Sequence, residues 1–198
     1  MKGTTILGLL SIHMTIKLGV LGGIGPDATA EFYRKLIAKL TLEYRIRSNR
    51  DFPQIIINSI PAPELVNDEI SEEEIIPYTN GLVELDRMGV DFMVMVCNTI
   101  HLYFDRLQKE VKAPILDMRK EVIKTIRSSG VKSVFIAGTP STITNGLYRF
   151  KGIRCFEPTH EEMLGLGRCI FDFNRGFERE NQINKLRRVC SKYLWIGS

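Results

Sequence analysis

Short apolar runs alternate with amphipathic stretches along the chain. Runs typical of buried strands occupy residues 16–21, 54–58, 90–96, 113–117, 131–138 and 153–156. Between them, apolar residues recur at the three- and four-residue spacing of helices, over residues 28–42, 75–88, 98–110, 119–128, 142–150, 161–173 and 178–189. This alternation predicts an α/β fold in which mostly parallel sheets are flanked by helices.

A short internal similarity suggests two lobes. Residues 131–138 (VKSVFIAG) have the pattern of residues 16–23 (IKLGVLGG), a strand that ends at a glycine turn. We therefore expect a first lobe over residues 14–116 and a second over 117–198, with the carboxyl ends of their strands facing a shared cleft. Residues 1–13 carry a short apolar run without a small-x-small cleavage site, and we expect a disordered or misassigned start.

Composition excludes several classes of protein. The chain has 198 residues and a formal charge of +4, and its basic residues are scattered among acidic ones. This distribution argues against a nucleic-acid partner. No apolar run approaches the roughly 20 residues of a membrane helix, which argues against a membrane partner. The four cysteines show no C-x-x-C pair. Their even number leaves disulfides open, but the size and the lack of a convincing export signal favour a reducing cytoplasm.

Residues 94–101 (VMVCNTIH) are the sharpest candidate for a reactive site. An apolar strand ends at Cys97, where ligands bind in open α/β sheets. Free N–H groups of the following helix would lower the pKa of a thiol placed there, and Thr99 could cap them. The alternative is an inert core cysteine, since free cysteine is often buried. His101 either reaches back toward Cys97 or the substrate, or is an ordinary helix-face histidine.

The glycine turn after the first strand resembles a dinucleotide fingerprint only in part. Gly23, Gly25 and Ala28 have the spacing, but the second strand ends at Asn58 and Ser59 instead of an acidic residue. We favour a turn whose backbone approaches a small anion, with N–H groups at the helix start binding a carboxylate.

Asn58 and Ser59 end one predicted strand, and Thr139 and Ser141 follow the glycine turn after another; short polar residues at strand ends suit a small polar ligand. As ordinary turn residues they would need no function.

Together, several segments resemble the aspartate/glutamate racemase family, and the likeness runs from about residue 14 to the end of the chain. The matching segments are residues 21–29 (LGGIGPDAT), Asn58 with Ser59, residues 97–101 (CNTIH), Gly138 with Thr139, and residues 146–148 (GLY). The glycine-proline turn and the Cys-Asn-Thr-x-His stretch are the most specific of these, above all in this order and spacing.

The resemblance implies two pseudosymmetric α/β lobes, a homodimer, no cofactor, no metal, and a small amino acid or dicarboxylate as ligand. It also implies that one cysteine removes the α-proton while another reprotonates the opposite face. Cys97 would be the first-lobe base, with His101 as a possible auxiliary. The substrate's α-carboxylate and ammonium would be held by a set of small polar residues: Gly25, Asn58, Ser59, Asn98, Thr99 and Thr139.

The sequence departs from the family in two places. Residues 59–65 (SIPAPEL) lack the arginine with which some aspartate-specific members bind the side-chain carboxylate, so the substrate stays open. The second cysteine, expected in a Gly-Cys-Thr-Glu type sequence, is also missing. Residues 195–198 (WIGS) resemble the lead-in to that strand, so we expect a truncated second lobe and impaired two-base racemisation. A non-catalytic carboxylate-binding relative is the main alternative, and a nucleotide-dependent enzyme a third.

Overall fold

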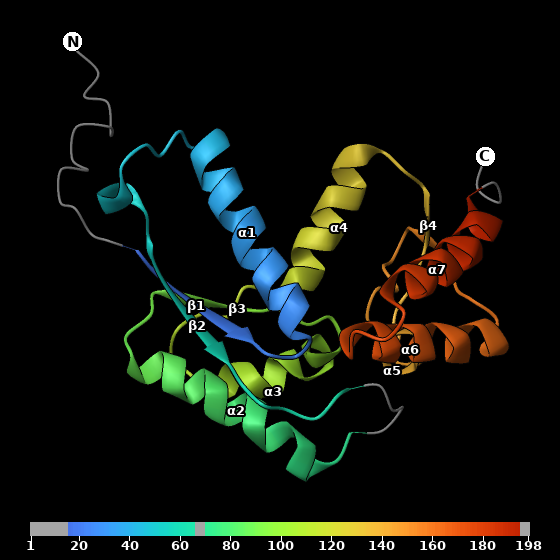
Figure 1. Cartoon of the computed structure of the whole chain (residues 1–198), viewed down its shortest axis with the longest axis horizontal. Helices are drawn as coiled ribbons and strands as arrows, with labels where there is room; N and C mark the ends of the chain where they lie inside the picture. The colour runs from blue at the N-terminus through green and yellow to red at the C-terminus, as the bar shows by residue number, and fades with distance from the viewer. Residues whose placement is uncertain (1–15, 66–69, 195–198) are drawn as a thin grey trace.

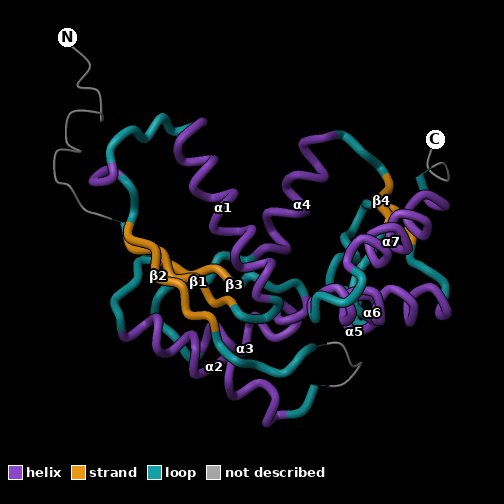
Figure 2. The backbone as a smooth tube through the Cα atoms, in the orientation of Figure 1, coloured by secondary structure: helices purple, strands orange, loops and turns teal. Residues whose placement is uncertain are grey.

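The computed structural model describes residues 16–65 and 70–194, and the predicted start at residues 1–13 and the tail at residues 195–198 lie outside this part. Two parallel sheets, each flanked by helices, follow one another along the chain (Figure 1, Figure 2). The predicted α/β class is confirmed. The first sheet is formed by strands within residues 14–116 and the second by strands within residues 117–198.

The first sheet has the order β2–β1–β3, with all three strands parallel. Its strands are β1 (Lys17–Gly22), β2 (Gln54–Ser59) and β3 (Phe92–Met95). The predicted strand at residues 113–117 is reduced to a single bridge between Ile115 and Met93. Because the strands are parallel and in register, their carboxyl ends lie at one edge of the sheet.

Helices cover both faces of this sheet: α2 (Glu72–Arg87) and α3 (Phe104–Lys109) on one side, and α1 (Pro26–Leu42) on the other (Figure 1). A short η2 (Asn49–Asp51) precedes β2. A capping box at Ser71 starts α2. The core lies mainly between the sheet and α2, and its fully buried members include Leu21, Ile75, Tyr78, Leu82, Leu85, Met93, Ile100 and Leu107.

The segment after β3 differs from the predicted helix over residues 98–110. It begins as the 3₁₀ helix η3 (Thr99–Tyr103) and continues as α3 from Phe104. A 3₁₀ turn is tighter than an α-helical turn. The residues that follow Cys97 are thus folded back close to it, as their hydrogen bonds show below.

The second sheet pairs β4 (Ser133–Phe135) with β5 (Arg154–Phe156) in parallel. Around it lie α4 (Met118–Ser129), α5 (Pro140–Thr144), α6 (His160–Asn174) and α7 (Arg179–Tyr193). The predicted helix over residues 142–150 is shorter, because Gly146 leaves the helix with a φ of 64°. Glu162 of α6 joins the two last helices, since it accepts hydrogen bonds from Lys192 and Tyr193 at 2.6 Å.

Candidate functional site

The carboxyl ends of β1, β3 and β4 lead into loops that border one cavity of about 680 Å³. Its wall is drawn from both lobes. Its polar and glycine residues include Gly23, Gly25, Glu64, Cys97, Asn98, Thr99, His101, Glu121, Thr139, Thr142, Tyr148 and Asn174. The shared cleft at the strand ends, which the sequence predicts, is present in the structure.

Two glycines shape the turn that enters α1. Gly23 and Gly25 have φ values of +87° and +86°, a region that side-chain-bearing residues rarely adopt. A Cβ on Gly23 would lie 2.2 Å from the carbonyl oxygen of Ile60, so any side chain there would force the backbone to shift. The Gly23 N–H donates to the hydroxyl of Thr29 at 3.0 Å. This bond ties the turn to the first turn of α1, whose N-terminus thus stands at the cavity.

Cys97 lies two residues beyond the end of β3 and lines the cavity. The N–H groups of Ile100 and Thr99 and the hydroxyl of Thr99 lower the pKa of its thiol, as their placement in the sequence suggests. Burial acts in the opposite direction and is the larger effect, so the pKa of Cys97 is raised overall. The expected net lowering is therefore wrong, because the low-dielectric surroundings of Cys97 disfavour the thiolate more than these donors favour it.

His101 is fully buried and reaches back to the loop that carries Cys97. Its Nδ1 lies 2.8 Å from the carbonyl oxygen of Cys97. A carbonyl can only accept, so Nδ1 carries the proton and Nε2 is the acceptor nitrogen. Among the described residues Nε2 has no partner. Burial lowers the pKa of His101, which keeps the ring neutral near pH 7.

Three threonine hydroxyls join the two lobes beside Cys97. The Thr99 hydroxyl lies 3.0 Å from those of Thr139 and Thr142, which are themselves 3.0 Å apart. The predicted cap at Thr99 is not formed, because the side chain is used in this contact instead. Thr139 provides a cap of its own, accepting from the N–H of Thr142 at the start of α5.

Tyr148 closes the second-lobe side of the cavity and was missed as a site residue, although residues 146–148 carry part of the family resemblance. Its hydroxyl donates to Oδ1 of Asn98, the residue after Cys97. Burial, with a smaller contribution from the charge of Cys97, raises the pKa of Tyr148 to about 12. The phenol is therefore protonated at neutral pH and acts as a hydrogen-bond donor.

Two of the predicted substrate-binding residues lie elsewhere. The amide of Asn58 donates to the carbonyl of Gly81 at 3.1 Å and to Glu84 at 2.7 Å, so it is directed to α2. Ser59 is exposed and, like Asn58, is not among the residues of the cavity wall. Of the other predicted residues, Gly25, Asn98, Thr99 and Thr139 line the cavity with Cys97 and His101. Substrate binding by any of them stays a prediction.

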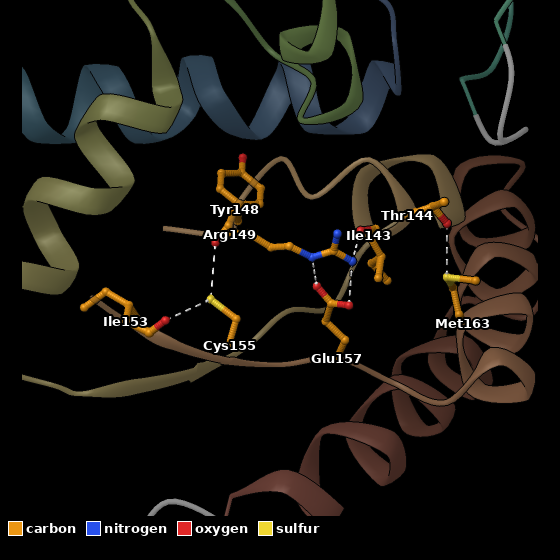
Figure 3. A network of polar contacts seen from close by, with 8 residues as sticks. All are labelled: Ile143, Thr144, Tyr148, Arg149, Ile153, Cys155, Glu157 and Met163. Carbon is orange, nitrogen blue, oxygen red and sulfur yellow. Dashed lines mark hydrogen bonds and ion pairs between the residues drawn. The ribbon is translucent and has the colours of Figure 1, made fainter. Parts of the chain in front are cut away.

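The remaining cysteines do not reach the cavity wall. Figure 3 shows Cys155 on β5, where its thiol donates to the carbonyl oxygens of Tyr148 at 3.5 Å and Ile153 at 3.7 Å. Beside it, the Arg149 guanidinium binds Glu157 in two hydrogen bonds of 2.5 and 2.8 Å. Cys169 lies on α6 and Cys190 on α7. Within the described residues, Cys97 is thus the one thiol on the wall.

The described residues contain no group of three or more His, Cys, Asp or Glu side chains that could hold a metal ion. In the same part of the chain, no helix is both long enough and apolar enough to cross a membrane.

Comparison with known protein families places the chain. The family model for Asp/Glu/Hydantoin racemases matches residues 21–192. The chain belongs to this family. The matched residues include the glycine turn, Cys97 and strands of both lobes, which together border the cavity.

Individual relatives agree with this assignment. The chain is 33% identical over 133 residues to the broad specificity amino-acid racemase RacX of Bacillus subtilis, an alignment that covers 67% of this chain and 58% of RacX. The chain thus spans little more than half the length of this curated relative. Two solved structures share the fold. An aspartate racemase of Picrophilus torridus has a TM-score of 0.72 at 23% identity and covers 90% of this chain and 76% of its own. An aspartate racemase homologue from Pyrococcus horikoshii OT3 has a TM-score of 0.62 at 28% identity and covers 86% and 77%.

The cavity wall of this chain also includes three residues that no sequence motif indicates. Glu64 lies in the loop after β2, Glu121 in the first turn of α4, and Asn174 at the end of α6. They are far apart in the sequence and follow no spacing rule. Only the packing of the two lobes brings them to one surface.

Proposed function

We propose that the chain acts at the α-carbon of an amino acid, as an aspartate/glutamate-type racemase does, and that Cys97 is the group that takes and returns the α-proton. The observation that carries the proposal is the position of Cys97. It lies just beyond the carboxyl end of β3, lines a cavity of about 680 Å³, and its sulfur is close to the N–H groups of Thr99 and Ile100.

In the proposed step, the Cys97 thiolate forms an S–H bond with the α-hydrogen as the C–H bond breaks. The electron pair of that bond passes into the adjacent carboxylate, which becomes enolate-like. Donors already in place around this carboxylate lower the barrier, because negative charge develops on it in the transition state. We assign this role to the side-chain amide of Asn98 and the N–H groups at the start of α1, because Asn98 and the first residues of α1 line the cavity.

Return of a proton to the same face regenerates the starting enantiomer and the thiolate. Racemisation requires a donor on the opposite face as well. Cys97 is the one thiol on the described wall, so we expect the chain as given to exchange the α-proton of one enantiomer with solvent and to racemise poorly. The reaction is defined by the α-carbon and its carboxylate, and needs no cofactor to supply the chemistry.

The test is deuterium incorporation at the α-carbon in heavy water, measured by proton NMR on each enantiomer of an amino acid in turn. We expect incorporation into one enantiomer, and its loss in Cys97→Ser. Equal rates for both enantiomers would contradict the one-face step, and incorporation that survives Cys97→Ser would contradict the role of Cys97.

A non-catalytic binder of small carboxylates is a second candidate, and the raised pKa of Cys97 favours it, because such a protein needs no reactive thiolate. The two are separated by the same experiment. A binder holds the amino acid, which calorimetry detects, without exchanging the α-proton of either enantiomer.

A further inference from the structure

The charged groups on the cavity wall are unusual for a site that would take a dicarboxylate. Among the residues that the structure describes, the wall includes two carboxylates, Glu64 and Glu121, and no lysine or arginine. His101 also lines the cavity, but burial lowers the pKa of its ring and keeps it uncharged near pH 7.

We propose that the cavity selects an amino acid whose side chain ends in a positive charge, such as an amine, and that Glu64 binds this charge. The inference rests on the proposed function and specifies its substrate class. A substrate with a second carboxylate would meet no lysine or arginine on the described wall, and it would be repelled by Glu64 and Glu121. An ammonium group would instead gain a charge-assisted hydrogen bond.

Glu64 is held at the cavity by its two neighbours. The hydroxyl of the fully buried Tyr78 donates to the carbonyl of Pro63, and the side chain of Leu65 is buried. The backbone is thus anchored on both sides of Glu64, while its own side chain is exposed. In the described part of the chain no ion pair occupies this carboxylate, whereas Glu121 has Lys124 at 3.8 Å. Glu64 is therefore the more available of the two.

The size of the cavity agrees with a longer side chain. A volume of about 680 Å³ lies within the range of roughly 300 to 1,000 Å³ that takes drug-sized ligands. The apolar part of the wall includes Phe32, Met118 and Ile170. Such surfaces suit the methylene groups of a long amine-bearing side chain, whose stem is apolar and whose end is charged.

The experiment compares three probes: L-lysine, its neutral isostere L-norleucine, and L-glutamate. Binding to the full chain is measured by calorimetry, and α-proton exchange in heavy water by NMR. We expect lysine to bind roughly fivefold or more tightly than norleucine, and glutamate most weakly. Equal or tighter binding of norleucine or glutamate, or no binding of lysine, would overturn the inference.

Variants assign the effect to Glu64. Glu64→Gln should lose the preference for lysine over norleucine, while Glu64→Lys should improve the binding of glutamate. Glu73→Gln is the matched control, because Glu73 is an exposed carboxylate at the start of α2 that does not line the cavity. Unchanged lysine preference in Glu64→Gln would overturn the role of Glu64, provided that its melting temperature matches that of the control.

The inference and the proposed function fail in different ways. Lysine that binds selectively but exchanges its α-proton from neither enantiomer would overturn the proposed function and support the inference. Exchange of glutamate in preference to lysine would overturn the inference and support the proposed function.

Discussion

The hydroxyl of Thr99, two residues after Cys97, lies 3.0 Å from the hydroxyl of Thr139 in the other lobe. Thr142 completes the contact at 3.0 Å from each. The position of the Cys97 loop is therefore coupled to the start of α5. Removing this contact should therefore weaken the packing between the lobes and change the surroundings of the Cys97 thiol at the same time.

Thr99→Val tests this coupling. The substitution keeps the shape of the side chain but removes a buried hydroxyl that bonds to two others and helps to lower the pKa of Cys97. We expect a loss of about 1–2 kcal/mol in the free energy of unfolding, measured by urea denaturation, and slower α-proton exchange.

Thr125→Val is the control for this change. Its hydroxyl bonds to a carbonyl within α4 and is exposed, so we expect a change within about 0.5 kcal/mol. Thr99→Val with the same small effect as the control would show that the lobes are not coupled through this residue.

The pH dependence of Cys97 follows from its burial. The pKa of the thiol is raised above its ordinary value, and the thiolate is the form that takes a proton. The proportion of thiolate therefore increases as pH rises, and α-proton exchange should climb steadily between about pH 7 and pH 10.

Alkylation by iodoacetamide should follow the same profile. The signal of the other three cysteines is subtracted with the Cys97→Ala variant. A rate that is already constant below about pH 7 would mean that the N–H donors outweigh burial and that the thiol is acidic.

Two glycines should respond to alanine in opposite directions. Gly23→Ala puts a Cβ 2.2 Å from the carbonyl oxygen of Ile60 at a φ of +87°, so the turn must move. We expect a loss of about 1–3 kcal/mol in the free energy of unfolding. Gly165 lies inside α6, and a Cβ there meets nothing within 4 Å.

Gly165→Ala should therefore stabilise the protein by roughly 0.5–1 kcal/mol, because alanine loses less backbone entropy in a helix. Both changes are measured by thermal and urea unfolding of the full chain. A neutral Gly23→Ala would show that the turn is not constrained by Ile60.

Local patterns predicted much of the fold because they depend on near neighbours. The apolar runs at residues 16–21 and 54–58 became β1 and β2, and the periodic stretch at residues 75–88 became most of α2. Where the prediction differed, backbone geometry was responsible. The segment after Cys97 starts as a 3₁₀ helix, and Gly146 shortens the helix after β4.

By itself, the sequence determined the α/β class, the glycine turn at Gly23 and Gly25, and the placement of Cys97 at a strand end, since each depends on consecutive residues. The tertiary structure alone decided what surrounds that thiol. It directs Asn58 to α2, brings Tyr148 to Asn98, and sets Glu64 on the cavity wall. These relations join segments tens of residues apart, and they arise when the elements pack within and between the lobes, which no local spacing encodes. Burial, which raises the pKa of Cys97, is likewise a property of the packed structure.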